Sequence, residues 1–200
     1  MNVRSDSVPS RPDARRVILA MNVSVDGFVG GPDGDLDWLW PTMDPEMSAD
    51  VVEFLQGVDT VLIGHETYLG QAAQWPNQSD PMADLLNSHT KIVFSTRLET
   101  LDWSNSRLAE DDVEGVVAEL KSKPGKNIFV TGGATLARSM SQAGLIDEYR
   151  VNIHPTLLGS GKPLFAEAAE LTRLHLAHTR TYDSGAILAH YRRIQAEEAS

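Results

Sequence analysis

The sequence predicts an α/β domain with a mostly parallel sheet that ends in a C-terminal antiparallel hairpin. Short apolar runs, typical of strands covered on both faces, alternate with amphipathic helical patterns along the first 150 residues. Several of these runs lead through a glycine or hydroxyl-rich turn directly into a helix start. The last two strand candidates, Leu174–Tyr182 and Ala186–Arg193, are separated only by Asp183-Ser184-Gly185, which is hairpin turn chemistry. Strand–helix units followed by a hairpin are the pattern of an α/β domain.

Length and composition limit the functions that the chain can serve. Its 200 residues fit one domain, which we assign to residues 16–194 between polar tails at 1–15 and 195–200. The net charge of −11 argues against binding to nucleic acid or to an anionic membrane. Cysteine is absent, which excludes disulfides and cysteine metal sites. Without a secretory pattern or a long apolar run, we expect a cytoplasmic protein.

The first strand leads toward a candidate catalytic carboxylate. Val17–Met21 is a continuous apolar run, and the next residues, 22–34, read as more strand followed by a loop with Asp26-Gly27 at a turn. An acidic residue just past a central strand can orient a substrate or move a proton. A turn aspartate that bonds its own backbone is an equally good interpretation.

Capping residues predict where several helices begin. Asp44-Pro45 combines an N-cap carboxylate with proline at the first helical position, and Asp80-Pro81 repeats this pattern. Asp112 caps a third helix. The loop before Asp44 contains Trp38 and Trp40, which cover a core edge or line a pocket. Later, in Tyr149–His154, apolar and polar side chains alternate as they do in a strand.

Three strand ends carry groups that suit an anion. The strand candidates 60–63, 91–94 and 128–131 are followed by the turns Gly64–Thr67, Ser95–Arg97 and Gly132-Gly133. Free N–H groups at a helix start attract phosphate, and arginine binds it bidentately. Each turn alone also fits a plain strand–helix connection. Because ligands bind beyond the carboxyl ends of strands in open α/β sheets, three such turns together favour a nucleotide.

The segments VILAMNVSVDGFVGGPDGDLDWL, VDTVLIGHETY, KIVFSTR, NIFVTGGATLARSM and LIDEYRVNIHPTLLGSGKPLF follow one another along the chain. In order and spacing the sequence resembles the dihydrofolate-reductase-like family, from Arg16 to Arg193. It is more similar to the branch with the reductase domain of bacterial riboflavin biosynthesis. The resemblance implies a three-layer fold with a twisted mixed sheet. It also implies a homodimer that uses NADPH to reduce a small heterocycle such as 5-amino-6-(5-phosphoribosylamino)uracil.

The resemblance also implies roles for individual residues. The pyrophosphate would lie at the turn Gly132-Gly133, the adenosine 2′-phosphate near Arg97 and the nicotinamide beside the first strand. The residues that would hold the cofactor are Met21, Asn22, Val23, Gly64, His65, Thr67, Ser95, Thr96, Arg97, Gly132, Gly133, Ala134, Thr135 and Leu136. A second set would frame the substrate: Trp38, Pro155, Gly159 and Gly161. Asp26, in the S-x-D-G motif, is the candidate catalytic residue; it or a nearby water would supply the proton.

Two departures from the family pattern leave alternatives open. His65 stands where the family commonly has arginine, and a neutral histidine is a weaker phosphate partner. Arg97 still favours NADPH over NADH. The region 38–44 only loosely resembles the substrate-binding acid of dihydrofolate reductase. A dihydrofolate reductase proper and a non-catalytic NADPH-binding sensor therefore remain as alternative functions.

Overall fold

The fold is a three-layer α/β arrangement around one long sheet. The computed structural model describes residues 14–165 and 171–194, so the predicted tails 1–15 and 195–200 lie outside the described residues except for residues 14 and 15. The sheet has eight strands, in the spatial order β5 (Ser106–Leu108), β4 (Thr90–Phe94), β3 (Val58–Gly64), β6 (Asn127–Thr131), β1 (Val17–Ser24), β7 (Glu148–His154), β10 (Ile187–Arg193) and β9 (Leu174–Thr181). Strands β5 to β7 in this order are parallel, whereas β10 is antiparallel to both β7 and β9. The predicted fold class is confirmed.

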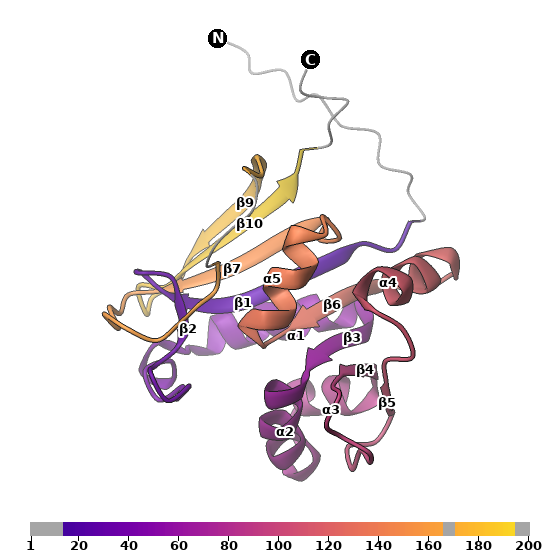
Figure 1. Cartoon of the computed structure of the whole chain (residues 1–200). Coiled ribbons are helices and arrows are strands. Elements are labelled where there is room, and N and C mark those ends of the chain that lie inside the picture. The colour runs from indigo at the N-terminus through magenta and orange to yellow at the C-terminus, as the bar shows by residue number, and fades with distance from the viewer. Residues whose placement is uncertain (1–13, 166–170, 195–200) are drawn as a thin grey trace.

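Helices cover both faces of the parallel part of the sheet. They are α1 (Pro45–Gln56), α2 (His65–Gln74), α3 (Pro81–Ser88), α4 (Val113–Ser122) and α5 (Ala134–Gln142), with the short 3-10 helices η1 (Trp40–Thr42) and η2 (Trp75–Asn77). Figure 1 shows α4 and α5 on the near face of the sheet and α1 behind it. One core packs beneath α4 and α5 and another beneath α1, α2 and α3. Within the described ranges, no helix has the length and apolar character needed to cross a membrane.

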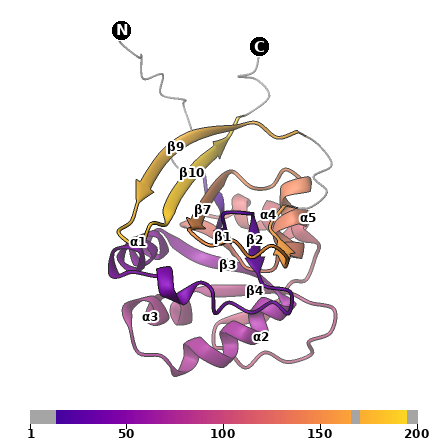
Figure 2. The same ribbon diagram turned by 90° about the vertical axis from the view of Figure 1, so that its left-hand side faces the viewer.

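The parallel topology places the candidate turns at one edge of the sheet. Because β3, β4 and β6 run in the same direction as β1 and β7, the turns after all five strands lie at the same edge. Two loops are joined at this edge by a small sheet of β2 (Phe28–Gly30) and β8 (Lys162–Pro163). Figure 2 shows this small sheet in front of the main one, with α1 near the ends of β9 and β10.

The helices begin in two different ways. Three have aspartate caps as predicted: Asp44 accepts a hydrogen bond from the Met47 N–H (2.8 Å), Asp80 from the Ala83 N–H (3.0 Å) and Asp112 from the Gly115 N–H (2.9 Å). The N-caps of α2 and α5 are Gly64 and Gly133, which offer no capping side chain. The first N–H groups of α2 and α5 are therefore left for another partner.

The domain begins slightly before the predicted boundary. Arg15, which we placed in the N-terminal tail, is buried at the start of the sheet. Its guanidinium donates hydrogen bonds to the Lys126 carbonyl (2.7 Å) and the Thr60 hydroxyl (2.8 Å), and it forms an ion pair with Asp59. An arginine beside a polar segment gave no burial signal in the sequence, because its partners lie 44 to 111 residues away.

A candidate dinucleotide groove and an adjoining cavity

The two uncapped helix starts meet each other. Gly132 and Gly133 have φ values of 58° and 77°, in the left-handed region that favours glycine. A Cβ on Gly132 would collide with the side chain of Thr67, and one on Gly133 would lie 3.5 Å from the Thr67 hydroxyl. The first turn of α2 therefore packs directly on the turn that begins α5. Two of the three predicted anion turns are therefore adjacent, and together with the third, at residues 95–97, we call them the candidate groove.

The third predicted turn extends this groove along β4. The Ser95 hydroxyl accepts hydrogen bonds from the backbone N–H groups of Arg97 and Leu98, both at 3.1 Å, and lies 2.7 Å from Nδ1 of His65. With its acceptor positions used in this way, the hydroxyl donates its own proton to His65 Nδ1. The Arg97 guanidinium donates to Glu66 at 2.6 Å and lowers the pKa of that carboxyl. Thr96 and Thr135 are exposed.

A cavity of about 170 Å³ adjoins the groove on the α1 side of the sheet. Strands β1, β6 and β7 line one wall, and α1, α2 and α3 line the other. Thr131, immediately before Gly132, and Gln71, one helical turn beyond Thr67, both line the cavity, so the cavity wall lies next to the candidate groove. Of the residues predicted to lie beside the nicotinamide, Met21 and Asn22 line this cavity. Val23 is buried in the core beneath α5.

A second group of polar residues, which the sequence did not reveal, lies in the cavity wall: Asp50, Gln71, Arg150, Asn152 and Tyr182. Asp50 accepts hydrogen bonds from Arg180 (2.5 Å) and from the Tyr182 hydroxyl (2.9 Å). Burial, followed by the bond to Asp50, raises the pKa of Tyr182, which keeps this hydroxyl protonated. These contacts hold the end of β9 and the hairpin turn against α1.

A buried histidine fixes the orientation of Asn22. His154 Nε2 lies 3.1 Å from the Asn22 carbonyl oxygen, which also accepts from the Asn152 amide at 3.0 Å. Burial lowers the pKa of His154 to about 4, so the ring is neutral at pH 7. Its Nε2 then donates to Asn22, and its Nδ1 lies 2.7 Å from the Thr42 hydroxyl, which also donates to the Leu39 carbonyl at 3.0 Å. The predicted substrate residue Trp38 packs edge-on against His154, with ring centroids 5.7 Å apart.

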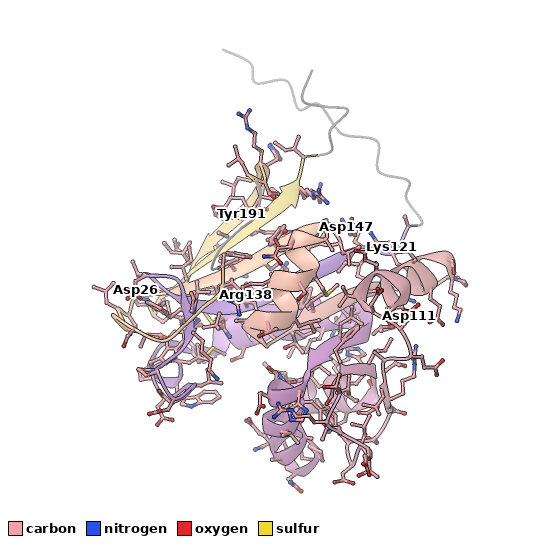
Figure 3. The ribbon with its side chains drawn as sticks, in the orientation of Figure 1. Asp26, Asp111, Lys121, Arg138, Asp147 and Tyr191 are labelled. Carbon is pink, nitrogen blue, oxygen red and sulfur yellow. The ribbon has the colours of Figure 1, made fainter. Side chains whose placement is uncertain are left out.

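Asp26 connects two loops at the outer edge of the molecule. Its carboxylate accepts hydrogen bonds from the Ser24 hydroxyl (2.6 Å) and from the backbone N–H groups of Gly159 (2.7 Å) and Leu158 (3.2 Å). The Ser24 hydroxyl, together with these N–H groups, lowers the pKa of Asp26. Figure 3 shows Asp26 at the tip of its loop, on the outside of the molecule. Its catalytic role stays a prediction, and this geometry also fits the loop-clamp interpretation.

The other predicted substrate residues lie outside the cavity wall, as Asp26 does. Gly159 lies in the loop that Asp26 binds, and a Cβ on Gly161 would collide with the Gly30 carbonyl, which ties this loop to β2. Pro155 is exposed beside Gly185 in the hairpin turn. None of Asp26, Trp38, Pro155, Gly159 and Gly161 lines the 170 Å³ cavity, so the structure divides the predicted substrate side into an inner cavity and an outer pair of loops.

The family model of the RibD C-terminal domain matches residues 15–188. The chain belongs to this family. Among curated proteins, the uncharacterized protein YyaP of Bacillus subtilis (strain 168) is 36% identical over 178 residues, which cover 86% of this chain and 92% of YyaP. The RibD C-terminal family match agrees with the resemblance drawn from the motifs.

Solved structures support the fold of this RibD C-terminal family member. A putative riboflavin biosynthesis protein from Shewanella sp. PV-4 has a TM-score of 0.77 at 23% identity, covering 90% of this chain and 99% of that one. Dihydrofolate reductase from Enterococcus faecalis, complexed with NADP(H), has a TM-score of 0.62 at 16% identity, covering 90% of this chain and 97% of the reductase. The dihydrofolate-reductase-like fold is thus shared.

Proposed function

We propose that the protein is a nicotinamide-dinucleotide-dependent reductase of a small heterocyclic substrate. The observation that carries this proposal is the meeting of two uncapped helix N-termini at Gly132 and Thr67, next to a cavity that Thr131 lines. A dinucleotide needs donors for its pyrophosphate, and its ring must reach a protected cavity. Membership of the RibD C-terminal family and the shared fold support the reductase class.

The groove residues fit such a cofactor, with NADPH as the first candidate. The turns Gly64–Thr67 and Gly132–Leu136 would hold the pyrophosphate, and Ser95–Arg97 would lie at the adenosine end. The glycines at 132 and 133 allow the backbone to approach a phosphate closely. When bound, the dinucleotide supplies a hydride at its nicotinamide ring. The protein supplies alignment and excludes water.

The residues of the cavity would orient the substrate. Met21 and Asn22 form the wall next to the groove, and the contacts of Asn22 with Asn152 and His154 hold its amide in one orientation. With the Asp26 pKa lowered and both of its oxygens bound, we infer that Asp26 orders the loop at residues 158 and 159, and that the substrate takes its proton from water. The pyrimidine intermediates of riboflavin biosynthesis are the first substrates to test.

The proposal is tested by titrating the purified protein with NADPH and NADH, following nicotinamide fluorescence. Cofactor oxidation is then measured with pyrimidine substrates and with dihydrofolate. We expect saturable dinucleotide binding and turnover of a pyrimidine. Turnover of dihydrofolate instead would identify a dihydrofolate reductase, and binding without turnover of any candidate would favour the sensor alternative. Absence of dinucleotide binding at millimolar concentration would refute the proposal.

A further inference from the structure

Arg150 brings a positive charge into the cavity wall without a carboxylate partner. Its guanidinium lies over the Phe54 ring, 4.9 Å from the ring centroid, and both residues line the cavity. Within residues 14–165 and 171–194, the side chain of Arg150 makes no hydrogen bond and no ion pair. Burial lowers the pKa of this guanidinium, but arginine keeps its charge in proteins. A partly buried charge without a hydrogen-bonded partner is unfavourable, so arginine in such a place requires an explanation.

The carboxylates around Arg150 are engaged elsewhere. Asp50 and Glu148 both raise its pKa through space, as do Tyr182 and the exposed Glu53. Both oxygens of Asp50 are bound, one by Arg180 and the other by Tyr182. Glu148, two residues earlier on the same strand, is bound by Arg16 at 2.6 Å and by His190 at 2.9 Å. Neither carboxylate therefore bonds directly to the Arg150 guanidinium.

Other polar groups beside Arg150 are also unpaired among the described residues. The amide N–H groups of Asn22 and the amide oxygen of Asn152 have no partner after the bond that joins these two side chains. The indole N–H of Trp75 and the side-chain oxygen of Gln71 are buried without one. Donors thus outnumber acceptors in this wall, as they would around a ligand rich in oxygen atoms.

We propose that Arg150 binds a planar oxyanion carried by a single-ring substrate, and so selects anionic rings over neutral or cationic ones. The inference deepens the proposed function, on which it rests. A guanidinium matches a carboxylate or a delocalised ring oxyanion with two parallel hydrogen bonds. A cavity of about 150 Å³ is known to hold benzene, so 170 Å³ suits one six-membered ring with small substituents. A protonated diamino ring carries the same positive charge as Arg150, so Arg150 would repel it.

The test uses three ring probes that differ mainly in the charge of a planar head group: benzoate, benzamide and benzamidine. Binding to the wild-type protein, with and without NADPH, is measured by calorimetry. We expect benzoate to bind about tenfold more tightly than benzamide, because charge-assisted hydrogen bonds are the stronger ones, and benzamidine to bind least. Arg150→Met should bring benzoate to the level of benzamide. Arg107 on β5 lies outside the cavity wall, so Arg107→Gln is the matched control and should leave the order unchanged.

Two further measurements separate binding from folding. Arg150→Met keeps an apolar chain on Phe54 and removes the unpaired charge, so it should melt at the same temperature as the wild type or higher. Arg150→Lys should keep part of the preference for benzoate. A melting temperature lowered by Arg150→Met, or equal affinity for all three probes, would overturn the inference. If NADPH still binds normally when the inference about Arg150 is overturned, the proposed function stands. If benzoate is preferred but NADPH does not bind, the proposed function is refuted while the anion preference of Arg150 remains.

Discussion

The groove and the cavity lie side by side, but the groove is formed mainly by backbone groups and the cavity by side chains. The groove consists mainly of backbone groups at Gly64, Gly132 and Gly133, with hydroxyls from adjacent residues of the same turns. The cavity consists of side chains from three strands, three helices and the C-terminal hairpin. A site made of backbone is determined by short segments, whereas a site made of side chains depends on distant elements packing together. The two regions therefore respond differently to substitution.

The largest expected effect comes from converting an uncapped helix into a capped one. Gly64 has φ −83° and ψ 162°, the extended conformation that Asp44, Asp80 and Asp112 also adopt at their caps. An added Cβ would lie 3.7 Å from Leu136 Cβ, which is ordinary contact. Gly64→Asp should cap α2 and place a negative charge against the pyrophosphate. We expect dinucleotide affinity to fall by more than about a hundredfold, since facing like charges cost several kcal/mol.

The control for this change is Gly64→Ala, which adds the Cβ without a charge or a cap. It should weaken dinucleotide binding only a few-fold, in titrations under the same conditions, where a few-fold corresponds to about 1 kcal/mol. Gly64→Asp should melt at or slightly above the wild-type temperature, because aspartate is a better N-cap than glycine by only about a few tenths of a kcal/mol. Wild-type affinity in Gly64→Asp would mean that the pyrophosphate does not lie at α2.

The same contrast explains what could be read from the sequence. Apolar runs, aspartate caps and glycine turns are local signals, and they were sufficient for the fold class, the three capped helices and the glycine N-termini of α2 and α5. Asp50 resembles any solvent-facing acid on a helix, because its partners Arg180 and Tyr182 lie 130 and 132 residues later. Its role depends on the docking of the hairpin against α1, which no local pattern records.

Arg150 is an intermediate case. Polar residues at 148, 150, 152 and 154 alternate with apolar ones, and this alternation was visible in the sequence. In an edge strand it would indicate a solvated face. Strand β7 lies between β1 and β10, and α1 covers part of that face, so the polar stripe becomes the cavity wall. The missing information was the position of the strand in the sheet, rather than the residues themselves.

The packing behind the cavity wall can be tested by measuring stability as a function of pH, because His154 is buried there in its neutral form. The pKa of His154 is lowered to about 4 by burial, whereas in the unfolded chain it should be about 6.5. Between these values the unfolded state binds more protons, so stability is full above pH 6.5 and falls as pH decreases toward 4. We expect His154 to account for a loss of about 3 kcal/mol over this window, measured by denaturant unfolding at several pH values.

Two other groups affect this measurement and require controls. Burial also lowers the pKa of His89, which adds a loss of stability in the same direction as pH falls. Glu148 has a lowered pKa as well, and its contribution is lost only at more acidic pH. His154→Gln should flatten the stability curve between pH 6.5 and 5, and His89→Gln should flatten it separately. An unchanged slope in His154→Gln would show that the ring is not buried in its neutral form.

The smallest expected effect concerns the adenosine end of the groove, where the ion pair between Glu66 and Arg97 lies beside the backbone groups. Glu66 holds the Arg97 guanidinium at 2.6 Å, although both side chains are largely exposed. An acid in such a position favours the ribose hydroxyl of NADH, whereas a free arginine favours the 2′-phosphate of NADPH. Glu66→Gln should release Arg97 and raise the affinity ratio of NADPH to NADH a few-fold, because exposed ion pairs contribute about 1 kcal/mol or less.

Comparison with Glu99→Gln separates this pair from general electrostatics. Glu99 is an exposed acid two residues after Arg97, so its substitution removes the same charge while leaving Glu66 on Arg97. Both variants are titrated with NADPH and NADH at low and at physiological salt. If Glu66 acts through its ion pair with Arg97, only Glu66→Gln changes the affinity ratio of NADPH to NADH substantially. Equal changes in the two variants, both lost at higher salt, would show that coenzyme preference follows the overall negative charge of the surface instead.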